Sequence, residues 1–153
     1  PTRRSSDLEM FDAVKAAVGG SDIFVSVAAV ADYRAKSTSA NKIKKGSGRA
    51  RTLELEENPD ILAWVAARPA PPLCVGFAAE SEDLASNARA KRSKKKLPLL
   101  AANLAQQALG ADENEITVFD ERGEHPLGRG PKIDLARKLM LHLAGMGTGR
   151  KRG

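Results

Sequence analysis

Residues 23–31 read IFVSVAAVA, an unbroken apolar run rich in β-branched side chains, with Asp32 directly behind it. A run of this length and composition is typical of a strand that is buried on both faces of a sheet. Residues 52–56 (TLELE) alternate polar and apolar side chains, which predicts a short, half-exposed strand. Further apolar runs predict buried strands at residues 73–79 (LCVGFAA), 97–102 (LPLLAA) and 116–119 (ITVF).

Helical patterns separate these strands. Apolar side chains recur at helical spacing in residues 9–18 and 131–144. Residues 58–67 begin with an Asn-Pro pair, a candidate N-cap followed by a first helical residue, and residues 81–95 begin acidic and end basic, as a helix dipole favours. Strands that alternate with helices predict an α/β class, a Rossmann-like and mostly parallel sheet flanked by helices. Residues 33–51 are polar and basic, which predicts a long flap loop after the early strand.

The composition excludes several kinds of protein. The apolar runs are too short to span a bilayer, so no membrane partner is expected. Cys74 is the single cysteine, which excludes an intrachain disulfide and predicts a reducing, cytoplasmic location. His125 and His142 lie far apart in the sequence and show no ligand spacing, so no zinc site is expected. The sequence also contains neither a GxGxxG fingerprint nor a P-loop.

Positive charge leaves one binding function open. The 153 residues carry 25 Lys or Arg against 19 Asp or Glu, a net charge of +6 at pH 7. The basic residues gather in residues 42–51, 89–96 and 150–152, which is compatible with a basic α/β module that binds nucleic acid. Residues 147–153 are expected to form a flexible basic tail, and residues 1–8 (PTRRSSDL) a non-native leader without a signal-peptide pattern.

Candidate site residues gather where the predicted parallel strands end, the edge at which such sheets bind ligands. Asp32 can contact a metal or polar ligand there, or serve as a turn residue, and Phe77 can stack on a base or pack in the core. Lys42 lies in the flap loop, where its ammonium group can close over phosphates or simply be solvated. Lys91 and Lys95, four residues apart on one helix face, can flank an anion or lie in solvent.

Five short motifs occur in order along the chain: AAVADYR at residues 28–34, KIKK at 42–45, NPDIL at 58–62, GFAAE at 76–80 and ARAKR at 88–92. Together they resemble the phosphopantothenate–cysteine ligase domain of the bacterial bifunctional coenzyme A biosynthesis flavoprotein. The resemblance implies a CTP- and Mg²⁺-dependent ligase that joins 4′-phosphopantothenate to cysteine through an acyl-cytidylate, with release of pyrophosphate and CMP. It also implies a homodimer, and an upstream decarboxylase domain that binds FMN.

The resemblance assigns roles to particular residues. It implies that Lys42 is catalytic and that most of the pocket for the second substrate lies in a segment before Glu9. Asn103, at the end of a predicted strand, is a candidate contact to that substrate, and the metal ligands are unknown. The positions that the resemblance implies for CTP contact are Ala28, Asp32, Lys42, Asn58, Pro59, Asp60, Ile61, Leu62, Phe77, Lys91 and Lys95.

The resemblance also has a gap. The family's Gly-rich strand and loop, with the Asn-containing segment behind them, are expected before Glu9 and are missing here. The expected organisation is therefore a partial ligase domain over residues 9–146, without the decarboxylase domain. Two alternatives stay open at this point: an inactive Rossmann-like fragment, and the basic nucleic-acid-binding module.

Overall fold

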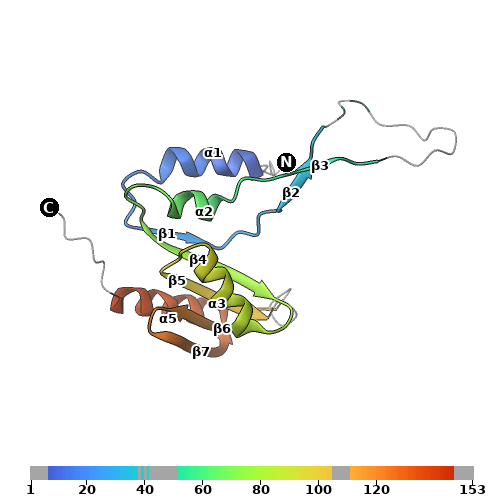
Figure 1. Ribbon diagram of the computed structural model, residues 1–153. Helices are drawn as coiled ribbons and strands as arrows, with labels where there is room; N and C mark the ends of the chain where they lie inside the picture. Colours follow the sequence, from blue (N-terminus) through green and yellow to red (C-terminus); the bar gives the residue numbers. More distant parts are fainter. Residues whose placement is uncertain (1–6, 38, 40, 42–51, 105–110, 147–153) are drawn as a thin grey trace.

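Figure 1 shows a computed structural model of the chain, which describes every residue except 1–6, 38, 40, 42–51, 105–110 and 147–153. The described residues form four helices and seven strands. In chain order these are α1 (Asp7–Ala17), β1 (Ile23–Ser26), β2 (Tyr33–Ala35), β3 (Leu55–Glu57), α2 (Ile61–Ala66), β4 (Leu73–Glu80), α3 (Leu84–Lys94), β5 (Leu99–Leu104), β6 (Glu113–Asp120), β7 (Gly123–Pro131) and α5 (Lys132–Gly145).

The main sheet has the strand order β1-β4-β5-β6-β7. Strands β1, β4 and β5 are parallel, whereas β6 pairs antiparallel with β5, and β7 antiparallel with β6. The predicted α/β class with a Rossmann-like sheet and flanking helices is confirmed. Strand β7 was not predicted from the sequence, because its glycines and prolines (GEHPLGRGP) have low strand propensity and its pairing with β6 stabilises it instead.

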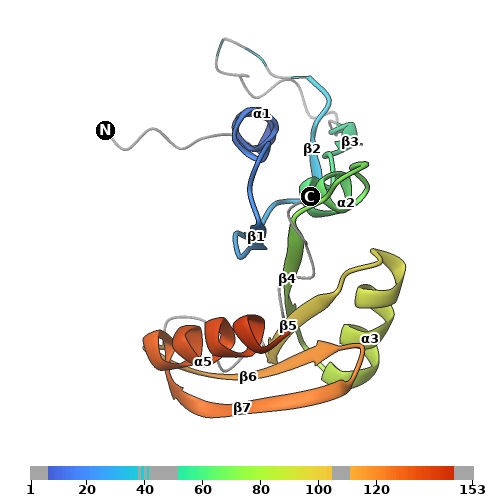
Figure 2. The same cartoon turned by 90° about the vertical axis from the view of Figure 1, so that its left-hand side faces the viewer.

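Two apolar layers cover the sheet. On one face, Leu62 and Val65 of α2 and Ala88 of α3 pack against β4 and β5, with Val14 of α1 at the margin. On the opposite face, three leucines of α5 pack against side chains of β4, β5 and β6; they are Leu135, Leu139 and Leu143. Figure 2 shows α5 and α3 on opposite sides of the sheet. Cys74 is buried in the first layer, as a small core residue, and this burial raises the pKa of its thiol.

The predicted strand at residues 23–31 is too long. Strand β1 ends at Ser26, where its pairing with β4 ends at Gly76, and residues 27–32 continue without strand structure. The expectation of burial on both faces is also wrong, because β1 is the outer strand of the described sheet and Val25 and Val27 are 37% and 62% exposed. An apolar run reports hydrophobicity but not the number of neighbouring strands.

The base of the predicted flap loop is a two-stranded ribbon. Tyr33–Ala35 pairs antiparallel with Leu55–Glu57, so the segment predicted as a loop begins with a strand and the strand predicted at residues 52–56 lies slightly later. This ribbon projects from the body of the molecule (Figure 1). Lys42 lies outside the described residues.

Two helix starts differ from the prediction. Asp60, not Asn58, is the N-cap of α2: its carboxylate accepts a hydrogen bond of 3.0 Å from the Ala63 amide. Helix α3 begins at Leu84, after Asp83 in the left-handed region with φ of 47°, rather than at Ser81. Within the described residues, every helix falls short of the length and apolarity that a bilayer span requires.

Candidate functional site

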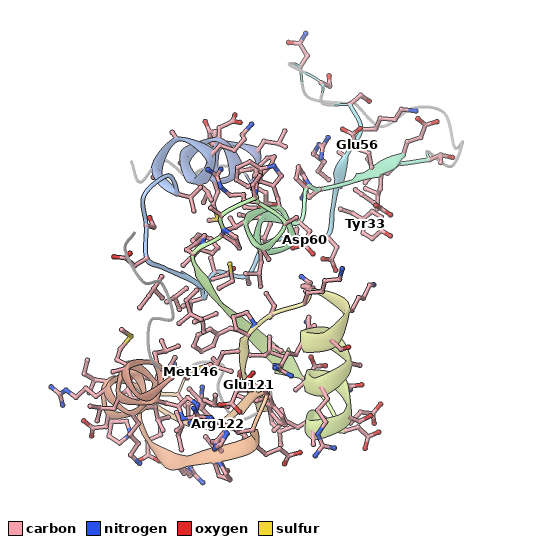
Figure 3. The ribbon with its side chains drawn as sticks, turned by 60° about the vertical axis from the view of Figure 1, so that its left-hand side comes forward. Tyr33, Glu56, Asp60, Glu121, Arg122 and Met146 are labelled. Atoms are coloured by element: carbon pink, nitrogen blue, oxygen red, sulfur yellow. The ribbon has the colours of Figure 1, made fainter. Side chains whose placement is uncertain are left out.

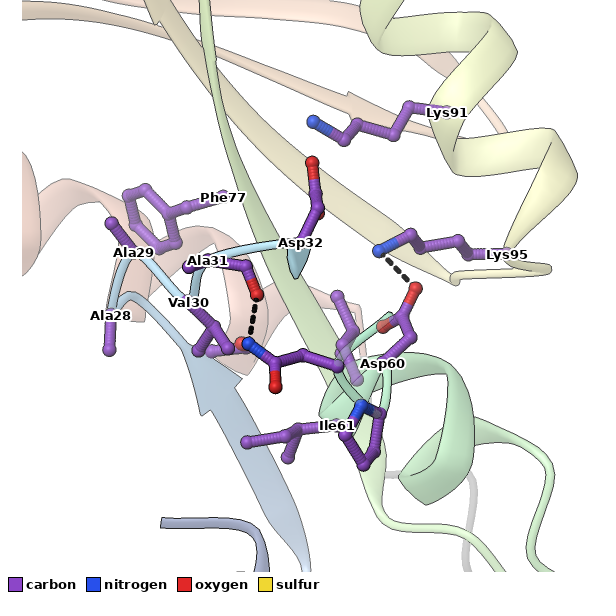
Figure 4. Close-up of a pocket in the computed structure, with 14 residues that line it drawn as sticks. Ala28, Ala29, Val30, Ala31, Asp32, Asp60, Ile61, Phe77, Lys91 and Lys95 are labelled. Carbon is purple, nitrogen blue, oxygen red and sulfur yellow. Dashed lines mark hydrogen bonds and ion pairs between the residues drawn. The ribbon is translucent and has the colours of Figure 1, made fainter. Parts of the chain in front are cut away.

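A pocket of about 300 Å³ opens where the parallel strands β1 and β4 end. Three parts of the chain surround it: residues 28–32 behind β1, residues 58–62 before and within α2, and the side chains of Phe77, Lys91 and Lys95. Figure 4 shows these groups around one space. The structure therefore brings together all the residues expected to contact CTP, apart from Lys42.

Asn58 holds the two loops of this pocket together. Its side-chain amide donates hydrogen bonds to the Ala31 carbonyl at 2.8 Å and to the Asp7 carboxylate at 3.0 Å. Its backbone N–H donates to the Asp32 carbonyl at 2.8 Å, and its side-chain oxygen accepts from Arg34 at 3.0 Å. Because the Asn58 side chain is used in these bonds, it shapes the pocket wall rather than capping α2.

An ion pair crosses the pocket mouth. The Lys95 ammonium lies 2.7 Å from the Asp60 carboxylate, and the dashed line in Figure 4 marks this contact. Burial acts to raise the pKa of Asp60, but the hydrogen bond from Lys95 and the backbone N–H groups at the start of α2 outweigh it and lower the pKa below 3.8. Lys95 is thus held at the pocket by an ionised partner.

Lys91 lies one turn before Lys95 on α3 and completes a cationic wall. Its ammonium is 3.7 Å from the Glu80 carboxylate, a looser contact than that of Lys95. Asp32 stands opposite these lysines (Figure 4), and within the described residues its carboxylate has neither a hydrogen bond nor an ion pair. Two ammonium groups beside an unpaired carboxylate suit a ligand that carries phosphates with a divalent cation.

Phe77, together with Ala28 and Ala29, lines both this pocket and a second cavity of about 610 Å³. The walls of the second cavity are mainly apolar side chains from β1, β4 and α5, among them Val25 and Met140. Asn103, which is 9% exposed, adds a polar group there, and its amide donates a 3.4 Å hydrogen bond to the Leu104 carbonyl. The expected second-substrate residue thus lies beside, and not within, the first pocket.

A cluster at the opposite edge of the sheet was not predicted from the sequence. His125 and His142 were expected to be too far apart to share a site, yet both rings contact the carboxylate of Asp120. Sequence separation was a poor guide because the β6–β7 hairpin and α5 fold back on one another. Hydrophobic periodicity of α5 was the available signal, since it places His142 beside the buried Leu139 and Leu143.

The fold and the site define a class: a Rossmann-like α/β domain with a pocket, lined by two lysines and two aspartates, at the carboxyl ends of its parallel strands, the place where such sheets bind nucleotides. The model of the family described as "DNA/pantothenate metabolism flavoprotein C-terminal domain" matches residues 3–146. The chain belongs to this family, so the resemblance found in the sequence is confirmed.

Relatives with known names agree with this assignment. The chain is 40% identical over 140 residues to the "Coenzyme A biosynthesis bifunctional protein CoaBC" of Vibrio cholerae, a match that covers 88% of this chain and 35% of that protein. It is 42% identical over 126 residues to the protein of the same name from Escherichia coli K12, which covers 78% of this chain and 31% of that protein. The chain thus spans about a third of the length of these relatives.

Solved structures share the fold. The crystal structure of the C-terminal domain of a CoaBC protein superimposes with a TM-score of 0.73 at 26% identity, covering 94% of this chain and 63% of that one. A DNA/pantothenate metabolism flavoprotein from Streptococcus pneumoniae superimposes with a TM-score of 0.72 at 17% identity, covering 94% of this chain and 72% of that one, which shows the fold alone.

Proposed function

We propose that this chain carries the CTP-dependent ligase half of a coenzyme A biosynthetic enzyme, joining 4′-phosphopantothenate to cysteine. The observation that carries the proposal is the single pocket in which residues 28–32, residues 58–62, Phe77, Lys91 and Lys95 converge. Every position that the resemblance implied for CTP contact, apart from Lys42, lines this pocket. The names of the bifunctional relatives support the pathway.

The pocket suits the nucleotide by charge and shape. Lys91 and Lys95 offer ammonium donors to the phosphates, and the aromatic ring of Phe77 offers a stacking surface to a base. Asp32 is the carboxylate of the pocket that fits Mg²⁺, which prefers oxygen ligands and commonly binds through one or two carboxylates plus phosphate oxygens. The metal would neutralise phosphate charge during transfer.

The proposed reaction has two steps. In the first, the pantothenate carboxylate attacks the α-phosphorus of CTP, and the bond to the β-phosphate breaks with release of pyrophosphate. In the second, the cysteine amine attacks the acyl carbon of the acyl-cytidylate, loses a proton, and CMP leaves. The cavity behind Phe77 is the proposed place for the pantothenate arm, because its apolar walls suit an aliphatic chain and Asn103 supplies a polar contact.

Lys42 is the proposed catalytic residue. It lies outside the described residues, in the part of the sequence that connects β2 to β3. A lysine delivered by such a segment can stabilise the charge that develops on the phosphates in the transition state. We further propose a homodimer, an upstream FMN-binding decarboxylase domain as in a bifunctional protein, and reaction in a reducing cytosol.

Titration calorimetry with Mg²⁺ tests the nucleotide assignment. We expect CTP to bind more tightly than ATP, GTP or UTP, because the resemblance to the CTP-dependent family extends over the residues that line this pocket. Equal affinity for all four nucleotides would contradict the proposal.

A turnover assay tests the chemistry separately. In the chain fused to the upstream segment of a bifunctional relative, pyrophosphate and phosphopantothenoylcysteine are measured by mass spectrometry. Lys42→Met should lower the ligation rate by roughly 10²–10³ while CTP binding weakens less, the scale of one lost preorganised electrostatic contact. Unchanged turnover would remove Lys42 from the mechanism and leave the nucleotide assignment intact.

A further inference from the structure

Three potential metal ligands meet at the edge of the sheet opposite the candidate nucleotide pocket. They are Asp120, His125 and His142, and their ligand atoms all lie within 4.8 Å of one another. They come from three places in the fold: the end of β6, the third residue of β7, and the last turns of α5.

The topology explains why they meet. Val118 and Asp120 point to the same face of β6, since side chains alternate along a strand. His125 is paired directly with Val118 across the β6–β7 hairpin, so it lies on that face as well. Helix α5 packs on the same face through Leu135, Leu139 and Leu143, which brings His142 to the sheet.

The ligand atoms of the three side chains lie close together. His125 Nε2 lies 2.9 Å from Asp120 Oδ1, and His142 Nε2 lies 3.0 Å from Asp120 Oδ2. The two imidazole rings are 4.7 Å apart between centroids. Figure 3 shows the turn residues Glu121 and Arg122 beside Met146, which follows α5, so the hairpin turn and the end of the helix lie together.

The carboxylate is held in place before any ligand arrives. Its Oδ1 atom accepts backbone hydrogen bonds from Arg122 at 2.7 Å and from Gly123 at 3.2 Å, which fixes the turn between the two strands. The Asp120 side chain is 1% exposed, and those of His125 and His142 are 32% and 19% exposed. Oδ1 also contacts the His125 ring, whereas Oδ2 contacts the His142 ring, and both rings stay partly exposed to solvent.

The Asp120 carboxylate is also kept ionised. Burial acts to raise its pKa, but the hydrogen bonds from His125, the Arg122 amide and His142 outweigh burial and lower the pKa to about 2. An ionised oxygen with two imidazole nitrogens is a ligand set that zinc uses, with the fourth position left to water.

We propose that Asp120, His125 and His142 form a binding site for a divalent transition-metal ion of the Zn²⁺ class, which ties the β6–β7 hairpin to α5. Tetrahedral Zn²⁺ with bonds of about 2.0–2.1 Å holds its ligand atoms about 3.3 Å apart. The two histidine–carboxylate separations, 2.9 and 3.0 Å, are a few tenths of an ångström shorter, and all three ligand atoms already lie within 4.8 Å of one another. Imidazole nitrogens favour zinc, copper and nickel over magnesium, so this ion differs in class from the one that accompanies a nucleotide.

The test is calorimetric titration of the full 153-residue chain with ZnCl₂ in a buffer free of chelators and phosphate. The chain contains only these two histidines, which makes the readout specific. We expect one equivalent to bind, with unchanged binding when excess MgCl₂ is present. His125→Gln and His142→Gln should each weaken binding by at least about tenfold, because loss of a ligand costs no less than loss of a residue that only orients a ligand.

The glutamine variants separate a metal site from a purely structural cluster. A glutamine amide can still donate to Asp120 but coordinates zinc poorly, so fold and metal-free melting temperature should stay close to wild type. Asp134→Asn is the matched control, because this exposed carboxylate of α5 pairs with Arg137 away from the cluster. Absence of Zn²⁺ binding to the wild type, or binding that survives both glutamine substitutions, overturns the proposal.

A second measurement uses the wild-type chain alone, so it still tests the proposal if the variants fail to fold. Co²⁺ bound to the wild-type chain should show the visible absorption of a four- or five-coordinate nitrogen–oxygen site, and one equivalent of Zn²⁺ should abolish it. A purely octahedral Co²⁺ spectrum overturns the proposal without use of any variant.

Discussion

Lys95 and Lys91 differ in how firmly the protein holds them, and the difference predicts unequal roles. Lys95 is 23% exposed and tightly paired with Asp60, whereas Lys91 is 43% exposed and 3.7 Å from Glu80. A preoriented, partly buried ammonium gains more from a phosphate than a solvated one. We therefore expect Lys95→Met to weaken CTP binding by about tenfold or more, the range for a charged hydrogen bond, and Lys91→Met to weaken it less.

Lys94→Met is the matched control for this pair. Lys94 lies on the same helix but does not line the pocket, so its substitution removes the same charge without the contact. Calorimetry with CTP and Mg²⁺ measures all three variants. Equal losses of CTP affinity in all three variants would mean that the net charge of the chain, and not contact with the pocket, governs CTP affinity.

The lowered pKa of Asp60 predicts that the stability of the fold depends on pH. Its pKa is lowered below 3.8 in the folded state, so it contributes stability that is present above pH 3.8 and is lost as the pH falls through the lowered value. At neutral pH, Asp60→Ala should cost about 1 kcal/mol as a lost N-cap, and Asp60→Asn less, because asparagine also caps. Urea unfolding at neutral and acid pH measures both.

Stability measured at acid pH separates the contribution of the Asp60 charge from that of its N-cap hydrogen bond. As the pH falls below 3.8, the difference in stability between wild type and Asp60→Asn should shrink, since the wild-type carboxylate takes up its proton. A difference that stays constant would show that the charge of Asp60 adds nothing to stability.

At the scale of elements, the ribbon of β2 and β3 is joined to the pocket by Arg34. Its guanidinium donates to the Glu57 carbonyl at 2.8 Å and to the Asn58 side chain at 3.0 Å, and pairs with Glu56 at 2.9 Å. Because an isolated two-stranded ribbon is marginally stable, Arg34→Ala should open it. We expect faster amide hydrogen exchange in Tyr33–Ala35 and Leu55–Glu57.

Lys36→Ala tests whether any lost ion pair has this effect. Lys36 pairs with Glu54 at 3.1 Å, but both side chains are exposed and neither contacts Asn58. Exchange in the ribbon should change little. If both variants accelerate exchange equally, Arg34 acts only as a surface charge.

Gly76 predicts how tightly β4 is packed below the pocket. A Cβ atom at this position would lie 2.8 Å from Leu100 Cδ1, 2.9 Å from Leu62 Cδ2 and 3.0 Å from Leu97 Cδ1. The leucine ends can shift, so Gly76→Ala should cost roughly 1–3 kcal/mol, as overpacked cores do. Denaturant unfolding measures the cost.

Gly130→Ala in β7 is the control, because a Cβ atom there meets nothing within 4 Å. It should leave the free energy of unfolding nearly unchanged. Because Leu62 also lines the candidate pocket, Gly76→Ala should weaken CTP binding as well. Wild-type stability of Gly76→Ala would contradict the packing argument.

Most of the helices and strands could be predicted from the hydrophobic pattern, and the errors in this prediction have physical causes. The runs at residues 73–79 and 97–102 are strands with neighbours on both sides, where apolar composition is decisive. β1 and β7 have one neighbouring strand each in the described sheet, and the hydrophobic pattern reports neither this edge position nor the pairing of β7 with β6. The pocket residues were found through motifs, whereas the Asn58 hydrogen bonds and the Asp120 cluster depend on tertiary contacts.

The charge of the whole molecule leads to a prediction about nucleic acids. The basic residues of α3 are partly neutralised within the fold: Arg89 pairs with Glu124, Lys91 with Glu80 and Lys95 with Asp60. Double-stranded DNA should therefore bind weakly, in a salt-dependent and sequence-independent way, and heparin should displace it. Fluorescence anisotropy with labelled duplexes measures this. Sequence-dependent binding that heparin does not displace would favour the basic-module reading.

The reversal of chain direction between β5 and β6 has a thermodynamic consequence. It sends Asn103 to one edge of the sheet and Asp120 to the other, with a buried layer of Leu99, Ala101 and Val118 between them. Groups so separated and without shared partners usually contribute additively. Stabilisation of the fold by Zn²⁺ and by CTP should then sum, with a coupling free energy close to zero, so that either ligand leaves the dissociation constant of the other unchanged.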